Sequence, residues 1–165
     1  MLAFLASVCL VLPAGASVVD PFRAPECQRC AGNRGIEYAV AAGTPVVSGV
    51  RGSVTFAGRV GGRNYVVVRA DADPRVRVTY GGLGSVAVAR GVAVRVGDRL
   101  GTAGAALHVG VRVGETYVDP LGFSGGVSRG VSGGATPHSS VARPRFRVTL
   151  GTVPSMVPVP APACG

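Results

Sequence analysis

The stretch that decides the fold is Val94-Arg95-Val96-Gly97-Asp98-Arg99-Leu100-Gly101, followed after five residues by Leu107-His108-Val109-Gly110-Val111-Arg112. Both parts are valine-rich and are interrupted by glycine, a composition that favours short strands and turns over helices. The same pattern extends over residues 32–123, where no segment keeps a helical period. We therefore expect strands at residues 46–47, 53–57, 65–69, 75–80, 86–89, 107–113 and 117–118.

The turn spacing between these segments predicts a mostly β protein, a small antiparallel sandwich or barrel. Arg75-Val76-Arg77-Val78 alternates polar and apolar side chains, as a strand with one wet and one buried face requires. The pairs Gly61-Gly62 and Gly81-Gly82 are interpreted as tight turns. Neither pair is followed by Lys-Ser or Lys-Thr, which excludes a phosphate-binding loop of that type.

The composition and net charge limit the classes of partner that the protein can bind. The chain has 165 residues, 47% hydrophobic and 15% charged, which is enough for one domain with a core. Its net charge of +9 comes from arginine alone, because the sequence contains no lysine. The arginines are scattered singly without interleaved aromatic residues, so the charge argues against nucleic-acid binding and favours attraction to an anionic cell envelope.

The two ends of the chain differ in composition from the middle. An apolar run begins at Met1, and small residues lead up to Ala16, which predicts a signal peptide over residues 1–16 and a secreted or cell-envelope protein. The run is too short to remain as a stable membrane anchor. Residues 124–165 are rich in glycine, serine and proline and are predicted to form a flexible, disordered tail that includes His138.

Residues 17–31 form a separate N-terminal segment that contains Cys27-Gln28-Arg29-Cys30. In an oxidising compartment these cysteines are expected to form a local disulfide with each other. A zinc-binding pair and a redox motif are the alternatives, although neither a second cysteine pair nor a strand before and a helix after the motif is evident. Cys164 is left over as an odd thiol.

Six segments within residues 32–123 resemble, in order, the signatures of the M23 (lysostaphin-type) family of cell-wall peptidases. Asn33-Arg34-Gly35-Ile36-Glu37 stands where the family has a His-x-Gly-x-Asp segment, and Tyr80-Gly81-Gly82-Leu83 where it often has Tyr-x-His-Leu. The other four are residues 42–46 (AGTPV), 52–58 (GSVTFAG), 94–101 (VRVGDRLG) and 107–112 (LHVGVR), the last followed by Asp119-Pro120. The resemblance implies the M23 fold over residues 32–123.

The resemblance also implies a zinc site. Members of this family hold one zinc ion with a His, an Asp and the second His of a His-x-His motif, and further histidines polarise the attacking water. In this chain Asn33 replaces the first His, Glu37 replaces the Asp, and His108 keeps the last ligand position. Gly82 and Ala106 occupy the two catalytic histidine positions and carry no proton-transferring group. Zinc binding is therefore expected to be weak or absent.

Two functions remain open after this mapping. The first is a secreted, catalytically inactive M23-like domain that binds peptidoglycan or regulates a cell-wall hydrolase, with a groove lined by Arg34, Tyr65 and Tyr80. For both tyrosines a core position with a satisfied hydroxyl is the alternative. The second function is an active zinc endopeptidase that uses Glu37, His108 and a third ligand from Asn33, Cys27 or Cys30. A lipoyl- or biotin-type carrier is excluded, since it needs an acceptor lysine.

Overall fold

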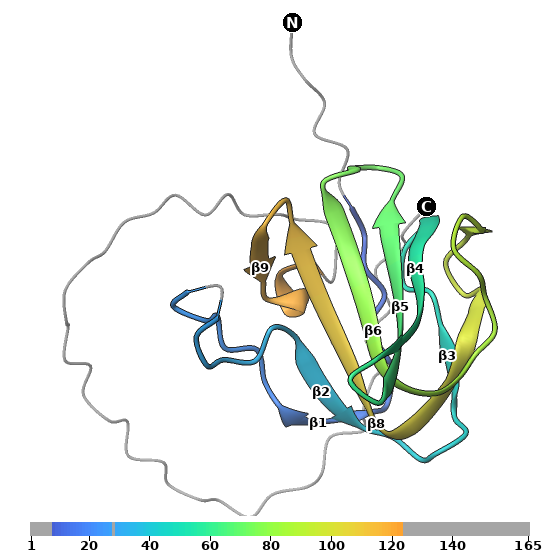
Figure 1. Ribbon diagram of the computed structural model, residues 1–165, viewed down its shortest axis with the longest axis horizontal. Coiled ribbons are helices and arrows are strands. Elements are labelled where there is room, and N and C mark those ends of the chain that lie inside the picture. Colours follow the sequence, from blue (N-terminus) through green and yellow to red (C-terminus); the bar gives the residue numbers. More distant parts are fainter. Residues whose placement is uncertain (1–7, 28, 124–165) are drawn as a thin grey trace, which may run out of the picture. The chain divides into compact units, whose positions relative to one another are not determined.

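The structure is a computed structural model that describes residues 8–27 and 29–123 (Figure 1). The expected tail, with His138 and Cys164, lies outside these residues. The described strands are β1 (Ser17–Asp20), β2 (Ile36–Ala39), β3 (Pro45–Val47), β4 (Gly52–Val60), β5 (Arg63–Ala70), β6 (Val76–Val86), β7 (Ala93–Val94), β8 (Arg99–Val113) and β9 (Thr116–Val118). A short 3₁₀ helix, η1 (Pro120–Phe123), follows β9.

All nine described strands belong to one antiparallel sheet, which confirms the expected mostly β fold. The strand order is β1-β2-β8-β6-β5-β4-β7, and β3 and β9 pair with the two ends of β8. Figure 1 shows β2, β8, β6, β5 and β4 side by side. Because β8 is 15 residues long, its first residues can pair with β3 and its last residues with β9.

The core lies on one face of this sheet. On β8 the side chains of Leu107, Val109 and Val111 are buried, and the neighbouring β6 buries Val78 and Tyr80 in the same way. Since successive side chains of a strand point to opposite faces, the residues between them face away from the core. This alternation places His108 on the outer face of the central strands, where a ligand can reach it.

Two local expectations are wrong. Residues 86–89 do not form a separate strand, because β6 continues without interruption up to Val86 and residues 87–89 have no regular structure. Gly81-Gly82 is not a turn between strands but an irregularity inside β6, where the register with β8 shifts between Gly81 and Leu83. The other glycine pair does form the β4–β5 turn, with Gly61 and Gly62 at φ angles of 54° and 83°.

Residues 8–16, expected to be removed with a signal peptide, pack against the β domain. Leu10 is 2% exposed, its amide donates to the Phe123 carbonyl at 3.2 Å, and the Val11 amide donates to the Gly49 carbonyl at 2.9 Å. A Cβ atom at Gly49 would stand 2.2 Å from the Val11 carbonyl oxygen, so this approach requires glycine. Cys9 in this segment is disulfide-bonded. Cleavage after Ala16 would therefore take a core residue away.

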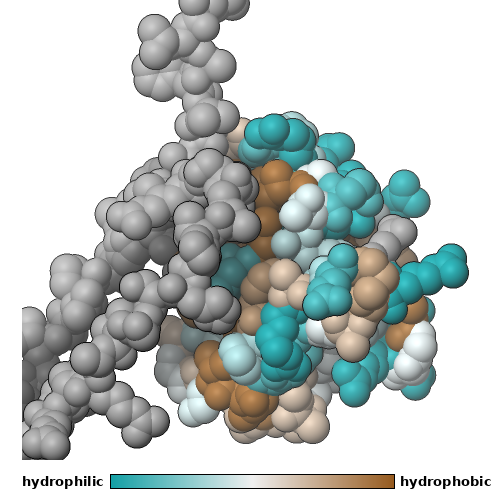
Figure 2. All heavy atoms as spheres, turned by 90° about the vertical axis from the view of Figure 1, so that its left-hand side faces the viewer, coloured by the Kyte–Doolittle hydropathy of each residue, from teal (hydrophilic) through white to brown (hydrophobic). Residues whose placement is uncertain are grey.

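The remaining surface features bear on partners. Cys27 and Cys30 form a disulfide with each other, as expected. Of the helices in the described ranges, none has the length and apolar character needed to cross a bilayer. Where Figure 2 shows coloured residues, hydrophobic and hydrophilic groups lie next to each other on the surface.

Candidate functional site

The candidate site is a row of four residues that crosses four neighbouring strands on the outer face of the sheet. Glu37 of β2 pairs with His108 of β8, His108 pairs with Gly81 of β6, and Gly81 pairs with Tyr65 of β5. Directly paired residues in an antiparallel sheet have Cβ atoms about 5 Å apart. The register of the sheet alone therefore brings together side chains from distant parts of the sequence.

Glu37 and His108 are bonded to each other. Nδ1 of His108 lies 2.7 Å from Oε1 of Glu37, and both side chains are about one quarter exposed. An ionised carboxylate can only accept a hydrogen bond, so Nδ1 carries the proton and donates. In this arrangement Nδ1 has no lone pair for a metal ion, whereas Nε2 of the neutral ring keeps one.

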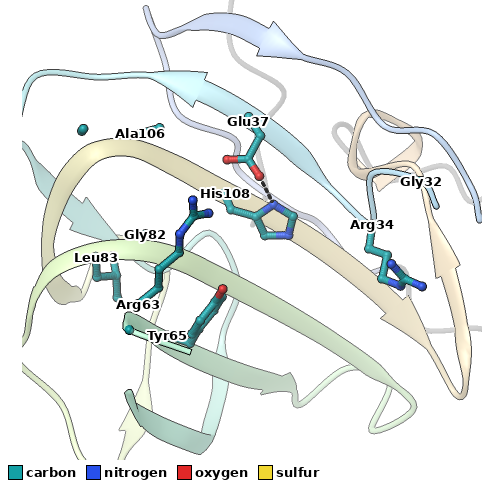
Figure 3. Close-up of a pocket in the computed structure, with 11 residues that line it drawn as sticks. Gly32, Arg34, Glu37, Arg63, Tyr65, Gly82, Leu83, Ala106 and His108 are labelled. Carbon is teal, nitrogen blue, oxygen red and sulfur yellow. Dashed lines mark hydrogen bonds and ion pairs between the residues drawn. The ribbon is translucent and has the colours of Figure 1, made fainter. Parts of the chain in front are cut away.

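A pocket of about 690 Å³ surrounds this pair (Figure 3). The structure thus brings together four of the five residues that the sequence placed at metal and catalytic positions, because Glu37, Gly82, Ala106 and His108 all line it. Arg34 and Tyr65, expected to bind a ligand, line it too. The other lining residues are Gly32, Gly62, Arg63, Leu83 and Ala105.

Asn33, the expected third metal position, does not line the pocket. It is 8% exposed, and its amide nitrogen donates to the carbonyl oxygens of Asp20 and Pro21 at 3.2 and 3.1 Å. Its amide oxygen accepts from the Gly35 backbone N–H at 3.3 Å. All polar atoms of this side chain are thereby engaged in holding the loop before β2, which is a structural role.

Gly82 stands at a catalytic histidine position, and the backbone there leaves no room for a side chain. Its φ angle is +73°, a conformation that residues with a Cβ atom rarely adopt. A Cβ atom built there would lie 2.4 Å from the Ala106 carbonyl oxygen. The position therefore excludes any side chain, histidine included, unless the irregularity in β6 is rearranged.

The neighbouring Gly81 permits a different close contact. A Cβ atom at Gly81 would stand 2.5 Å from the Tyr65 ring and 3.3 Å from the His108 Cβ atom. Glycine thus lets the tyrosine ring lie directly on β6 next to His108. Tyr65 is half-buried and forms an apolar wall of the pocket, and its role in binding a ligand stays a prediction.

Tyr80, also expected to line the groove, lies in the core instead. It is 2% exposed, and its hydroxyl accepts a hydrogen bond from the Gly49 backbone N–H at 2.7 Å. Burial raises the pKa of Tyr80 to about 12. The structure therefore agrees with the alternative interpretation of this residue, a core tyrosine with a satisfied hydroxyl.

Arg63 is a pocket residue that the sequence analysis missed. It begins β5, directly after the Gly61-Gly62 turn, and its exposed side chain extends into the pocket (Figure 3). Its position in a hairpin opposite Val60 gave no functional signal, because no M23 signature covers it. Its place near His108 emerges from the folded structure, in which both residues line the pocket.

The donors in the pocket do not fit a zinc ion held by three protein ligands. Two ligand atoms bound to one tetrahedral zinc stand about 3.4 Å apart, whereas Glu37 and His108 are in direct contact at 2.7 Å. Within residues 8–27 and 29–123 no three His, Cys, Asp or Glu side chains are grouped as metal ligands would be. Cys27 and Cys30 cannot supply the third ligand, since their sulfur atoms are bonded to each other.

Residues 31–120 match the model of Peptidase family M23, so the chain belongs to this family. A comparison with curated proteins finds no match. The match covers the whole site, including the positions where Gly82 and Ala106 stand.

Several solved structures share the fold. Helicobacter pylori Csd3 is 21% identical with a TM-score of 0.61, and the match covers 73% of this chain but only 37% of Csd3. The catalytic domain of the antimicrobial peptidase lysostaphin from Staphylococcus simulans is 20% identical with a TM-score of 0.59, covering 66% of this chain and 91% of that domain. The structure of the complex of SpoIIIAH and SpoIIQ contains a chain that is 19% identical with a TM-score of 0.58, covering 70% and 99%. At these identities the likeness shows the fold alone.

Proposed function

We propose that this chain is an exported M23-family domain of the cell envelope that binds a cell-wall peptide without hydrolysing it. The observation that carries the proposal is the state of the two catalytic histidine positions. Ala106 has no group that can accept a proton, and the backbone at Gly82 excludes a side chain. Without a general base, hydrolysis loses a contribution of about 10²–10⁴-fold.

The retained pocket supports binding rather than loss of all function. Its volume of about 690 Å³ lies in the range of ligand-binding pockets, and it joins an apolar wall with charged groups. An extended peptide suits a site on the outer face of a sheet, because its backbone can follow the strands. The net charge of +9 favours attachment to an anionic wall.

A regulatory role toward a cell-wall hydrolase is a second form of the same proposal. Its support is that an M23-like fold occurs in the SpoIIIAH and SpoIIQ complex, which is an assembly of proteins. The pocket and the replacement of the catalytic histidines support peptide binding and hydrolase regulation equally.

Metal analysis together with a wall-digestion assay tests the proposal. We expect the purified protein to contain well under one zinc ion per chain and to release no fragments from purified peptidoglycan, while it sediments with that peptidoglycan. The alternative, an active zinc endopeptidase, would be supported by stoichiometric zinc and cleavage that His108→Ala abolishes. His138→Ala, which changes the only other histidine in the sequence, is the matched control.

A further inference from the structure

Positive charge is in excess in the pocket. Arg34 and Arg63 both line it, together with a single acidic residue, Glu37. This carboxylate already accepts a hydrogen bond from His108. We infer that the pocket binds a carboxylate group of its peptide ligand, with Arg63 as the principal contact. The inference deepens the proposed function and rests on it.

Arg63 has the donors that such a contact needs. Its side chain makes no hydrogen bond or ion pair with any residue in the described part of the chain. Figure 3 shows Arg63 and Glu37 extending toward His108 from different sides. A guanidinium group presents a planar fork of N–H donors that matches the two oxygens of a carboxylate. The fork of Arg63 is therefore open toward the position where a ligand would lie.

Arg34 lines the pocket as well, but its side chain extends away from His108 (Figure 3). Its guanidinium donates to the Cys30 carbonyl at 3.3 Å and lies 5.5 Å from the centre of the Tyr117 ring. Arg63 is therefore the arginine whose side chain extends toward the position of a ligand next to His108.

The apolar wall next to these charges favours a peptide over a small inorganic anion. Tyr65 lies directly on Gly81, and Leu83 and Ala105 complete that part of the lining. These residues can contact the aliphatic part of a ligand whose carboxylate reaches Arg63. Inorganic phosphate would gain the charge contact but not the apolar one, so it should bind more weakly than a peptide carboxylate.

The test compares a peptide acid with its amide. Acetyl-D-alanyl-D-alanine and its C-terminal amide are titrated into the ¹⁵N-labelled full chain, and the amide signals of Gly82, Ala105 and Ala106 are followed. We expect the acid to bind about tenfold more tightly than the amide, a difference of about 1.4 kcal/mol. Arg63→Gln should abolish this preference. Arg59→Gln, in the same hairpin but outside the pocket, should retain it.

Equal affinity for acid and amide would overturn the inference, and so would a preference that survives in Arg63→Gln. Tighter binding of inorganic phosphate than of the acid at the same signals would also overturn it. The two proposals fail separately in this experiment. Cleavage of the peptide would overturn the inactive-domain proposal, whereas equal affinity without cleavage overturns only the carboxylate contact.

Discussion

Truncation of Leu10 to alanine is expected to destabilise the β domain, although sequence analysis assigns this residue to a removed signal peptide. Leu10 is 2% exposed and belongs to the same core cluster as Val50, Tyr80 and Leu100. Leucine-to-alanine changes at buried positions cost about 2–5 kcal/mol through lost burial and the cavity left behind. The lower half of that range suits a residue in a segment outside the strands, which can relax around the cavity.

The assay is chemical denaturation of the full chain, followed by far-ultraviolet circular dichroism. We expect Leu10→Ala to lower the free energy of unfolding by about 2–3 kcal/mol, or the melting temperature by about 8–20 °C. The matched control is Val11→Ala, because Val11 is adjacent but 47% exposed and should cost about 0.5 kcal/mol or less. Deleting residues 1–16 should destabilise further, since the Leu10 and Val11 backbone hydrogen bonds are lost as well.

The reasoning would be refuted if Leu10→Ala were no less stable than Val11→Ala, or if the protein lacking residues 1–16 were as stable as the full chain. Either result would show that residues 8–16 are not part of the stable domain and would agree with cleavage after Ala16. N-terminal sequencing of the exported protein gives an independent answer. If Leu10 stabilises the domain as its burial indicates, the exported protein should still contain it.

Three further predictions concern the core and the site. Tyr80→Phe should reduce the loss of stability at alkaline pH. In the wild type the tyrosine of the unfolded chain ionises above a pKa of about 10, whereas the pKa of buried Tyr80 is raised to about 12, so the free energy of unfolding falls by roughly 3 kcal/mol between these pH values. Urea denaturation at each pH measures this fall in both proteins. Gly82→Ala should lower the free energy of unfolding by about 1–3 kcal/mol or more. The loss should exceed that of Gly62→Ala, where φ is +83° but no atom lies within 4 Å of the new Cβ atom. Thermal melts of the two variants test this difference. The double change Glu37→Asp and Ala106→His should raise zinc affinity, measured by competition with a chelating dye, without restoring wall hydrolysis, and failure to bind zinc would contradict the residue mapping. Adding Asn33→His should raise the affinity no further, because position 33 lies outside the pocket.

The ordered family signatures were sufficient to predict the fold and the meeting of Glu37 with His108, because the resemblance assigns both residues to one metal site although β2 and β8 are far apart in the sequence. They could not predict the orientation of Asn33. Its amide is bound by the backbone at Asp20 and Pro21, a segment outside the matched signatures. Nor did they separate Tyr65 from Tyr80, although Tyr80 continues the alternation that buries Val76 and Val78.

The role of Gly82 illustrates the same limit. In the sequence, Gly82 and Ala106 are equivalent, because each stands at a position where the family has a catalytic histidine. In the structure the two positions differ, because Ala106 pairs in register with Ala39 of β2, lines the pocket and already carries a Cβ atom. Gly82 has a positive φ angle and a carbonyl oxygen where its side chain would begin.

Restoring the metal ligands and restoring the catalytic histidine at position 82 therefore require different changes, so metal binding and catalysis can be separated. Side-chain substitution can rebuild donors at positions 37 and 106, since both residues line the pocket and already carry a Cβ atom. It cannot rebuild a histidine at position 82 without moving the backbone between Gly81 and Leu83, where the register of β6 with β8 shifts. A variant that binds zinc but leaves the wall intact is the outcome that follows from this difference. Zinc binding with efficient hydrolysis would mean that the β6 backbone is more adaptable than its contact with Ala106 indicates.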